Sequence, residues 1–348
     1  MTSGKSPGGF EEFPALAYPD GALMALRARS QPALAEASVW QLGNELLARI
    51  ERNELPPIDD PIAWLGSMLG WTLRKRLDVH ANRFARRRYL DLYGTLYSHC
   101  VPRPPIEGAT WVDLGCGGMN PLGLLTVFLA LGARRGIGVD LDPVRDEDLA
   151  ARAIADAAAT MILDPSGIAW DYKIDAQQVL RNLAGLDLRR LHRGELAGVG
   201  DRLAFRNCSI YDMAIGQGEA DVVISNAFLE HIPDVARGVR EIARITKPGG
   251  YSVHNIDMTD HRRYANAAGP LDFLTEASSS PILHHSNRLR LSDFAAIFEA
   301  AGFEIAGSRA HYPVEVPADL RQRMVEPFRS KAQQDLEAGV VVLVARRR

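Results

Sequence analysis

The sequence has few cysteines and no long apolar run. Its 348 residues include only Cys100, Cys116 and Cys208, an odd number at scattered positions. This usage argues against a disulfide framework or a zinc site and fits a reducing compartment. No stretch approaches the roughly 18 apolar residues that a membrane span needs, and no apolar run follows Lys5 as it would in a signal peptide. We therefore expect a cytoplasmic protein that does not associate with membranes.

A strong net charge is also absent. The formal net charge is −3, so no excess of positive charge is available to attract nucleic acid, and we expect no nucleic-acid partner. The contents of 47% hydrophobic and 24% charged residues are those of an ordinary globular protein. The length suits one core domain with an appendage.

The stretch 110–123 predicts a buried strand, a glycine-rich turn and the start of a helix. Gly115 and Gly117 let the chain turn tightly and let a ligand approach the backbone. Asn120 is expected to cap the helix, which should end near Gly132. Such a unit offers free N–H groups and the positive end of a helix dipole, which predicts a site for a nucleoside-bearing ligand.

The third glycine of a dinucleotide-binding fingerprint is missing. The pattern G-x-G-x-x-G would need a glycine where Asn120 stands, which disfavours an NAD-linked oxidoreductase. Asp140 ends a predicted strand about 20 residues beyond Gly117, where a carboxylate can accept both hydroxyls of a ribose. The alternative is that Asp140 only caps a helix, and we favour the ribose role.

Two segments together resemble class I S-adenosylmethionine (SAM) methyltransferases. Asp113, Gly115 and Gly117 form a D-x-G-x-G pattern that resembles their first motif, and residues 221–251, with LEH at 229–231 and KPGG at 247–250, are more specifically similar. The resemblance covers roughly residues 108–258 and, more loosely, the chain to its end. It implies an α/β fold with a Rossmann-like seven-stranded sheet, mostly parallel with an antiparallel last strand. Two predicted strands near 303–310 and 339–345 suit this arrangement.

A narrower likeness is visible in two segments. Residues 254–261 and 286–294 look like bacterial methyltransferases of glycans and natural products.

The chain is expected to contain two parts. We expect a helical region at 1–105 and a methyltransferase domain at 106–348. Residues 144–202 are long for a crossover between strands, and they predict a helical insertion that is either a cap over the acceptor or an elaboration.

The N-terminal helical region has two open interpretations. Its arginines and lysine between positions 74 and 88 form either a solvated helix face or a patch for a phosphate-bearing substrate. The same helices could join two subunits in a homodimer.

The resemblance also implies which residues hold SAM. Asp113 would hold the methionyl ammonium, Gly115 and Gly117 would let the backbone approach the cofactor, and Asp140 would take the ribose. The turn after a predicted strand at 203–207 would meet the adenine. The full expected set is Asp113, Gly115, Cys116, Gly117, Asp140, Leu141, Ser209, Ile210, Asp212 and Asn226.

Histidines and acids gather where two predicted strands end, at the edge where open α/β sheets bind ligands. The catalytic candidates are His231, His254, Asp257 and His261, with Asp260 beside them. A histidine with a pKa near neutrality can accept a proton. A structural hydrogen-bond network and a metal site are the alternatives.

A metal site is not predicted, because one ligand of a known arrangement is missing. Some ubiquinone-pathway and small-RNA methyltransferases bind a divalent ion with an E-x-x-E-H pattern. Here Glu230 and His231 are present, but Ala227 stands in place of the first acid, and His254 or Asp257 could complete an altered site.

These observations predict a SAM-dependent methyltransferase that acts on a small-molecule or sugar acceptor. Methylation at oxygen, with a histidine or aspartate as general base, is the leading hypothesis. An N-methyltransferase and a catalytically inactive SAM-binding regulator or scaffold are the alternatives.

Overall fold

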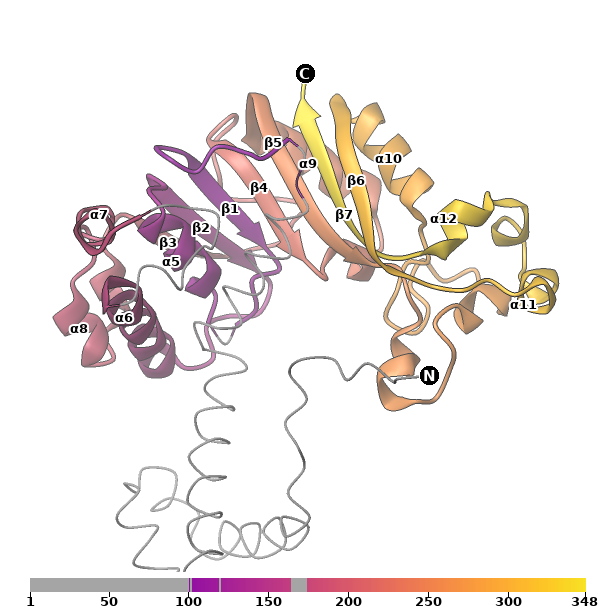
Figure 1. Cartoon of the computed structure of the whole chain (residues 1–348), viewed down its shortest axis with the longest axis horizontal. Helices are drawn as coiled ribbons and strands as arrows, with labels where there is room; N and C mark the ends of the chain where they lie inside the picture. Colours follow the sequence, from indigo (N-terminus) through magenta and orange to yellow (C-terminus); the bar gives the residue numbers. More distant parts are fainter. Residues whose placement is uncertain (1–99, 101, 119, 164–173) are drawn as a thin grey trace, which may run out of the picture. The chain divides into compact units, whose positions relative to one another are not determined.

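The computed structural model describes residues 100, 102–118, 120–163 and 174–348 of the chain (Figure 1). The predicted N-terminal helices, their basic positions and the possible dimer contacts of that region lie outside the described residues. The methyltransferase domain predicted for 106–348 falls almost entirely within them.

The core of the described region is a seven-stranded sheet with the order β3-β2-β1-β4-β5-β7-β6. The first five strands run parallel, whereas β7 runs antiparallel to both of its neighbours. This confirms the predicted sheet and its antiparallel last strand. The strands are β1 Thr110–Leu114, β2 Arg135–Asp140, β3 Leu203–Asn207, β4 Ala220–Asn226, β5 Thr246–Asp257, β6 Phe303–Pro313 and β7 Ala338–Arg347.

Helices connect the strands. The α-helices are α5 Gly123–Ala130, α6 Glu147–Leu163, α7 Ala176–Asn182, α8 Leu188–His192, α9 Val235–Ile245, α10 Leu291–Ala300, α11 Ala318–Arg323 and α12 Gln333–Glu337. Short 3₁₀ turns are η3 Leu196–Val199, η4 Leu229–His231, η5 His261–Ala265, η6 Asp272–Thr275 and η7 Phe328–Ser330.

The central strands are covered by helices on both faces. Every residue of β1 is buried, as expected for a parallel strand inside a doubly covered sheet. Val112 and Leu114 pack in the cluster that includes residues of α9 and α10. Trp111 points to the opposite face, where its ring stacks on Phe128 of α5 with centroids 3.8 Å apart. Alternate residues of β1 therefore join two separate cores.

The described helices of the predicted insertion form part of one covering layer. Helix α6 packs against α5 and α8, and α7 also contacts α5. Their buried residues belong to the same core as Trp111. The three helices lie together beside β2 and β3 at one end of the sheet (Figure 1). The described helices of the insertion thus contribute to the core at this end of the sheet.

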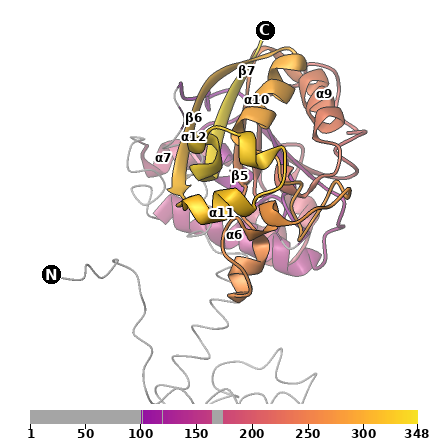
Figure 2. The same cartoon turned by 90° about the vertical axis from the view of Figure 1, so that its right-hand side faces the viewer.

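A third group of apolar residues lies beside the opposite part of the sheet. We call it the satellite cluster: Leu271, Phe273, Leu274, Val314, Val316, Leu320, Met324, Phe328 and Leu336. It joins the segment after β5 to the connection between β6 and β7, which carries α11 and α12 (Figure 2).

A fully buried arginine links the satellite cluster to the sheet. Arg290, just before α10, donates hydrogen bonds to the backbone carbonyls of Leu336 (2.9 Å), Ala338 (2.7 Å) and Met258. Burial lowers the pKa of Arg290 to about 10. One side chain thus joins the segment after β5, the end of α12 and the start of β7.

Candidate active site

The glycine turn and the acid of β2 meet at the carboxyl ends of their strands. Gly115 donates its N–H to the Val139 carbonyl at 2.9 Å, and Gly117 donates to Oδ2 of Asp140 at 2.7 Å. Both glycines have positive φ, +66° and +78°. A Cβ at Gly115 would lie 2.3 Å from the ring of Phe228, whereas a Cβ at Gly117 would meet no atom within 4 Å. The turn is therefore packed on one side and open on the other.

A buried carboxylate lies under this turn. Asp113 is 7% exposed, and burial raises its pKa to about 8, helped by the nearby negative charge of Asp140. Burial and the same two carboxylates also raise the pKa of the Cys116 thiol, so that it stays neutral. Two carboxylates held close together at a buried strand end favour a positively charged ligand.

Asn120 does not cap helix α5, as the sequence had predicted it would. Helix α5 begins at Gly123, with Leu122 at its N-cap position and no side-chain capping bond. Asn120 is 5% exposed, and neither its amide nitrogen nor its amide oxygen has a hydrogen-bond partner among the described residues. An unpaired buried amide suits a ligand that supplies the missing partners. The capping prediction was wrong, although a polar residue inside a glycine loop was itself a signal for a ligand contact.

The ends of β2 and β3 are tied together. Cys208 donates its N–H to the Asp140 carbonyl at 3.1 Å. Of the predicted adenine contacts that follow, Ile210 is buried, Ser209 is half-buried and accepts the N–H of Tyr211, and Asp212 is exposed. Leu141, the residue after Asp140, is 71% exposed. Because this apolar side chain is exposed at a strand end, a flat ligand can pack against it.

The next part of the site is the turn after β4. Asn226 accepts a hydrogen bond from the side-chain amide of Asn255 at 2.8 Å, which joins the ends of β4 and β5. Ala227 is exposed with φ of +46°, and Phe228 then packs its ring onto Gly115. This turn therefore spans from the glycine turn to the polar residues after β5.

His254 is not accessible to an acceptor. It is fully buried inside β5, and its Nδ1 and Nε2 lie 2.7 and 2.6 Å from the hydroxyls of Ser225 and Ser252. Burial lowers its pKa to about 3. Both ring nitrogens are thus engaged inside the sheet. His254 is a structural residue, which corrects its prediction as a catalytic base.

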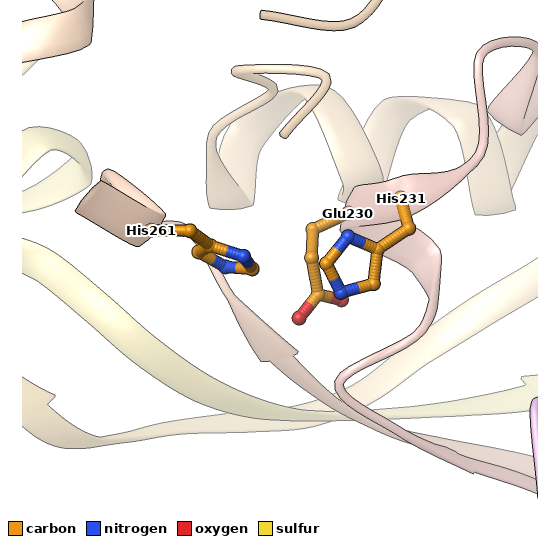
Figure 3. Close-up of side chains that lie close together, drawn as sticks. All are labelled: Glu230, His231 and His261. Atoms are coloured by element: carbon orange, nitrogen blue, oxygen red, sulfur yellow. The ribbon is translucent and has the colours of Figure 1, made fainter. Parts of the chain in front are cut away.

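His231 and His261 do come together, and Glu230 lies between them (Figure 3). One ligand-type atom from each of the three side chains lies within 4.8 Å of the others. Glu230 is fully buried, and burial raises its pKa to about 8. Its Oε1 accepts the N–H of Asp257 at 3.1 Å. Burial lowers the pKa of His261, which favours the neutral imidazole.

The two aspartates of this region differ in their surroundings. Asp257 accepts hydrogen bonds from the hydroxyls of Thr259 and Tyr264, and its Oδ2 lies 3.7 Å from Nε2 of His261. Asp260 is fully buried, forms an ion pair with Arg262 and accepts the N–H of Phe273. Asp257 therefore belongs to the histidine cluster, whereas Asp260 holds the segment after β5 in place.

A family model described as "Methyltransferase domain" matches residues 81–307. The chain belongs to this methyltransferase family. A ubiquinone biosynthesis O-methyltransferase from Ralstonia nicotianae is 25% identical over 244 residues, which covers 70% of this chain and 78% of that protein. An uncharacterized methyltransferase from a Mycobacterium species (strain KMS) is 37% identical over 67 residues, or 19% of this chain and 26% of that protein.

A solved structure of a SAM-dependent methyltransferase from Mesorhizobium loti is also similar. It is 14% identical with a TM-score of 0.39, and the match covers 71% of this chain and 94% of that chain.

The family match and the sheet order make the chain a class I SAM-dependent methyltransferase, as the resemblance implied. The residues at the ends of β1 and β2 fit its cofactor. The unpaired amide of Asn120 offers polar partners, the open side of Gly117 offers space, and the buried carboxyl group of Asp113 can ionise against a cationic group. SAM supplies an activated methyl group on a sulfonium.

None of the helices in the described part of the chain is both long and apolar enough to span a membrane.

Proposed function

We propose that this methyltransferase transfers a methyl group to a hydroxyl of a small-molecule or sugar acceptor. The observation that carries the proposal is the cluster of Glu230, His231 and His261, beside Asp257, at the sheet edge that also carries the glycine turn. Relatives named ubiquinone biosynthesis O-methyltransferases support oxygen as the acceptor atom. A protein that only bound SAM would have no need for such a cluster.

The cofactor roles that we propose are those that the sequence resemblance implies, with Asn120 added to them. Asp113 takes the methionyl ammonium, and Gly117 leaves room for the cofactor against the backbone. Asp140 and Leu141 contact the ribose and adenine, with Ser209, Ile210 and Asp212 near the base. Asn226 lies near the methyl group. Asn120 offers its amide to the methionyl end.

The affinity for SAM is expected to rise with pH through Asp113. Because the pKa of Asp113 is raised to about 8, the free protein holds a proton there that the cationic cofactor must displace. The dissociation constant should therefore fall about tenfold per pH unit between about pH 6 and 7.5. Calorimetry across that window measures it. Asp113→Asn should remove the slope, and Asp319→Asn, at an exposed position on α11, should keep it. A wild-type affinity independent of pH would contradict this role.

Methyl transfer also requires that a hydroxyl lose its proton. The acceptor oxygen bonds to the methyl carbon, the carbon–sulfur bond breaks with its electron pair left on sulfur, and the hydroxyl proton must go to a base. For a reaction that uses no metal ion, we assign the role of this base to His261. Its pKa is lowered, its Nε2 has no hydrogen-bond partner among the described residues, and Asp257 lies beside it.

Replacing His261 with alanine is expected to lower turnover roughly a hundredfold. The affinity for SAM should stay within about twofold of the wild type, because the contacts of His261 are with His231, Tyr264 and Asp257 and not with the predicted cofactor residues. Single-turnover assays with saturating SAM, together with calorimetry, separate the two effects. Full turnover in the variant would remove His261 from the reaction.

The acceptor class is tested by formation of S-adenosylhomocysteine. We expect formation that depends on acceptors with phenolic or sugar hydroxyls and not on the matched amines. Formation with amines alone would indicate an N-methyltransferase. Tight SAM binding without turnover on any acceptor would indicate the regulatory or scaffold alternative.

A further inference from the structure

Three potential metal ligands converge after β4 and β5. Glu230 and His231 belong to η4, and His261 begins η5. Their ligand-type atoms lie within 4.8 Å of one another, close enough for one ion to contact all of them. The side chains point toward a common space (Figure 3). His231 and His261 stand in one group of predicted catalytic candidates, and the structure adds Glu230 to them.

Two of the three side chains each have a buried, unpaired polar atom. Oε2 of Glu230 and Nε2 of His261 have no hydrogen-bond partner among the residues that the structure describes. Buried polar atoms are rarely left without a partner, so both atoms suit a ligand that would pair with them. Oε1 of Glu230 already accepts the N–H of Asp257, so Oε2 is the carboxylate oxygen that remains available to a ligand. Oδ2 of Asp257, at 3.7 Å, is too far to pair with His261 by a hydrogen bond.

The hydrogen bonds around His231 leave its other ring nitrogen free. Nδ1 lies 2.6 Å from the backbone carbonyl of His285. A carbonyl oxygen can only accept, so Nδ1 carries the proton and Nε2 keeps its lone pair. Histidine ligands of metals are usually oriented by a hydrogen bond of this kind. Three unshared electron pairs, one from each side chain, are thus available.

We propose that Glu230, His231 and His261 bind a divalent transition-metal cation that activates the acceptor hydroxyl. This inference rests on the proposed O-methylation and deepens it. Two imidazoles and one carboxylate suit Zn²⁺, Co²⁺, Mn²⁺ or Fe²⁺, whereas Mg²⁺ and Ca²⁺ prefer oxygen ligands. Three protein ligands leave positions open for an acceptor oxygen. Ala227 stands at the position of the first acid in the E-x-x-E-H pattern. In this chain the third ligand would instead be His261, which follows β5.

The cation changes how the proton is removed. A bound divalent cation lowers the pKa of a hydroxyl that it contacts, so that the proton can pass to solvent near neutral pH. His261 then acts as a ligand in place of a base. The bonds made and broken in methyl transfer are otherwise those given above.

Metal binding is tested on the full chain after treatment with EDTA and removal of the chelator. Titration with Zn²⁺ by calorimetry should show one site, Co²⁺ should develop visible absorption bands, and Mg²⁺ should not compete. We expect Glu230→Gln and His231→Ala to weaken Zn²⁺ binding roughly a hundredfold or more. Glu230→Gln keeps an oxygen for the N–H of Asp257, and His231 is exposed, so both variants should fold. His192→Ala, on an exposed position of α8, is the matched control.

Failure of this inference and failure of the proposed function are distinguishable. Equal Zn²⁺ affinity in the wild type, Glu230→Gln and His231→Ala, or acceptor-dependent methylation that EDTA leaves unchanged, would overturn the cation while the O-methyltransferase stood. Specific binding of one Zn²⁺, lost in those variants, together with metal-dependent methylation of a hydroxyl would support it. The same binding without methylation of any hydroxyl would overturn both the activating role and the proposed function.

Discussion

Replacing Arg290 with methionine is expected to lower the free energy of unfolding by about 3–5 kcal/mol. The arginine is fully buried, and its guanidinium donates to the carbonyls of Met258, Leu336 and Ala338. Methionine has a similar length but no donor, so these buried carbonyls would lose their partner at a cost of about 1–3 kcal/mol each, offset in part by the gain from not burying a charge. Urea denaturation followed by circular dichroism measures the change.

Arg189→Met is the matched control, because Arg189 is exposed on α8. Its effect should stay within about 0.5 kcal/mol. Arg290 also fixes the backbone next to Asp257, so its loss should reduce activity in the variant that remains folded. An unfolding free energy unchanged within error in Arg290→Met would show that the satellite cluster and the sheet do not depend on this link.

The features predicted from the sequence are those set by local patterns. Gly115, Gly117 and Asp140 were recognisable because a strand, a tight turn and an acid at a strand end follow one another at short range. The structure joins them by the hydrogen bond from Gly117 to Asp140. The parallel part of the sheet followed from similar local patterns, because β1 and β4 are short, largely apolar strands that end at turn residues.

The features that were missed depend on contacts between distant segments. The enclosure of His254 was missed because the second half of β5 is buried on both faces, so its sequence shows no alternation that would mark which side chain is enclosed. One of the two hydroxyl partners of His254 is Ser225 on the neighbouring strand β4. The convergence of His261 on Glu230 depends on how the segment after β5 folds back, which Asp260 and Arg290 fix through long-range contacts.

The glycine turn offers the sharpest test of the cofactor site. Gly115 has φ of +66°, and a Cβ there would lie 2.3 Å from Cδ2 and 3.0 Å from Cβ of Phe228, so rotation of the ring alone cannot relieve the overlap. A β-branched residue at positive φ adds backbone strain of about 1–3 kcal/mol, and the overlap adds a similar amount. In Gly115→Val we expect the turn to shift and SAM binding to weaken by about 4 kcal/mol, or roughly a thousandfold.

A substitution at a second glycine, Gly218, measures the backbone strain without the steric overlap. Gly218 has φ of +62° and no atom within 4 Å of an added Cβ, so Gly218→Val carries the strain without the overlap. Calorimetry should show SAM binding near the wild-type value in Gly218→Val, although its thermal stability should fall. Adding Phe228→Ala to Gly115→Val should recover about tenfold in affinity, because it removes the colliding ring. If Gly115→Val bound SAM as tightly as the wild type, the cofactor would not depend on this turn, and the roles proposed for its neighbours would have to be abandoned.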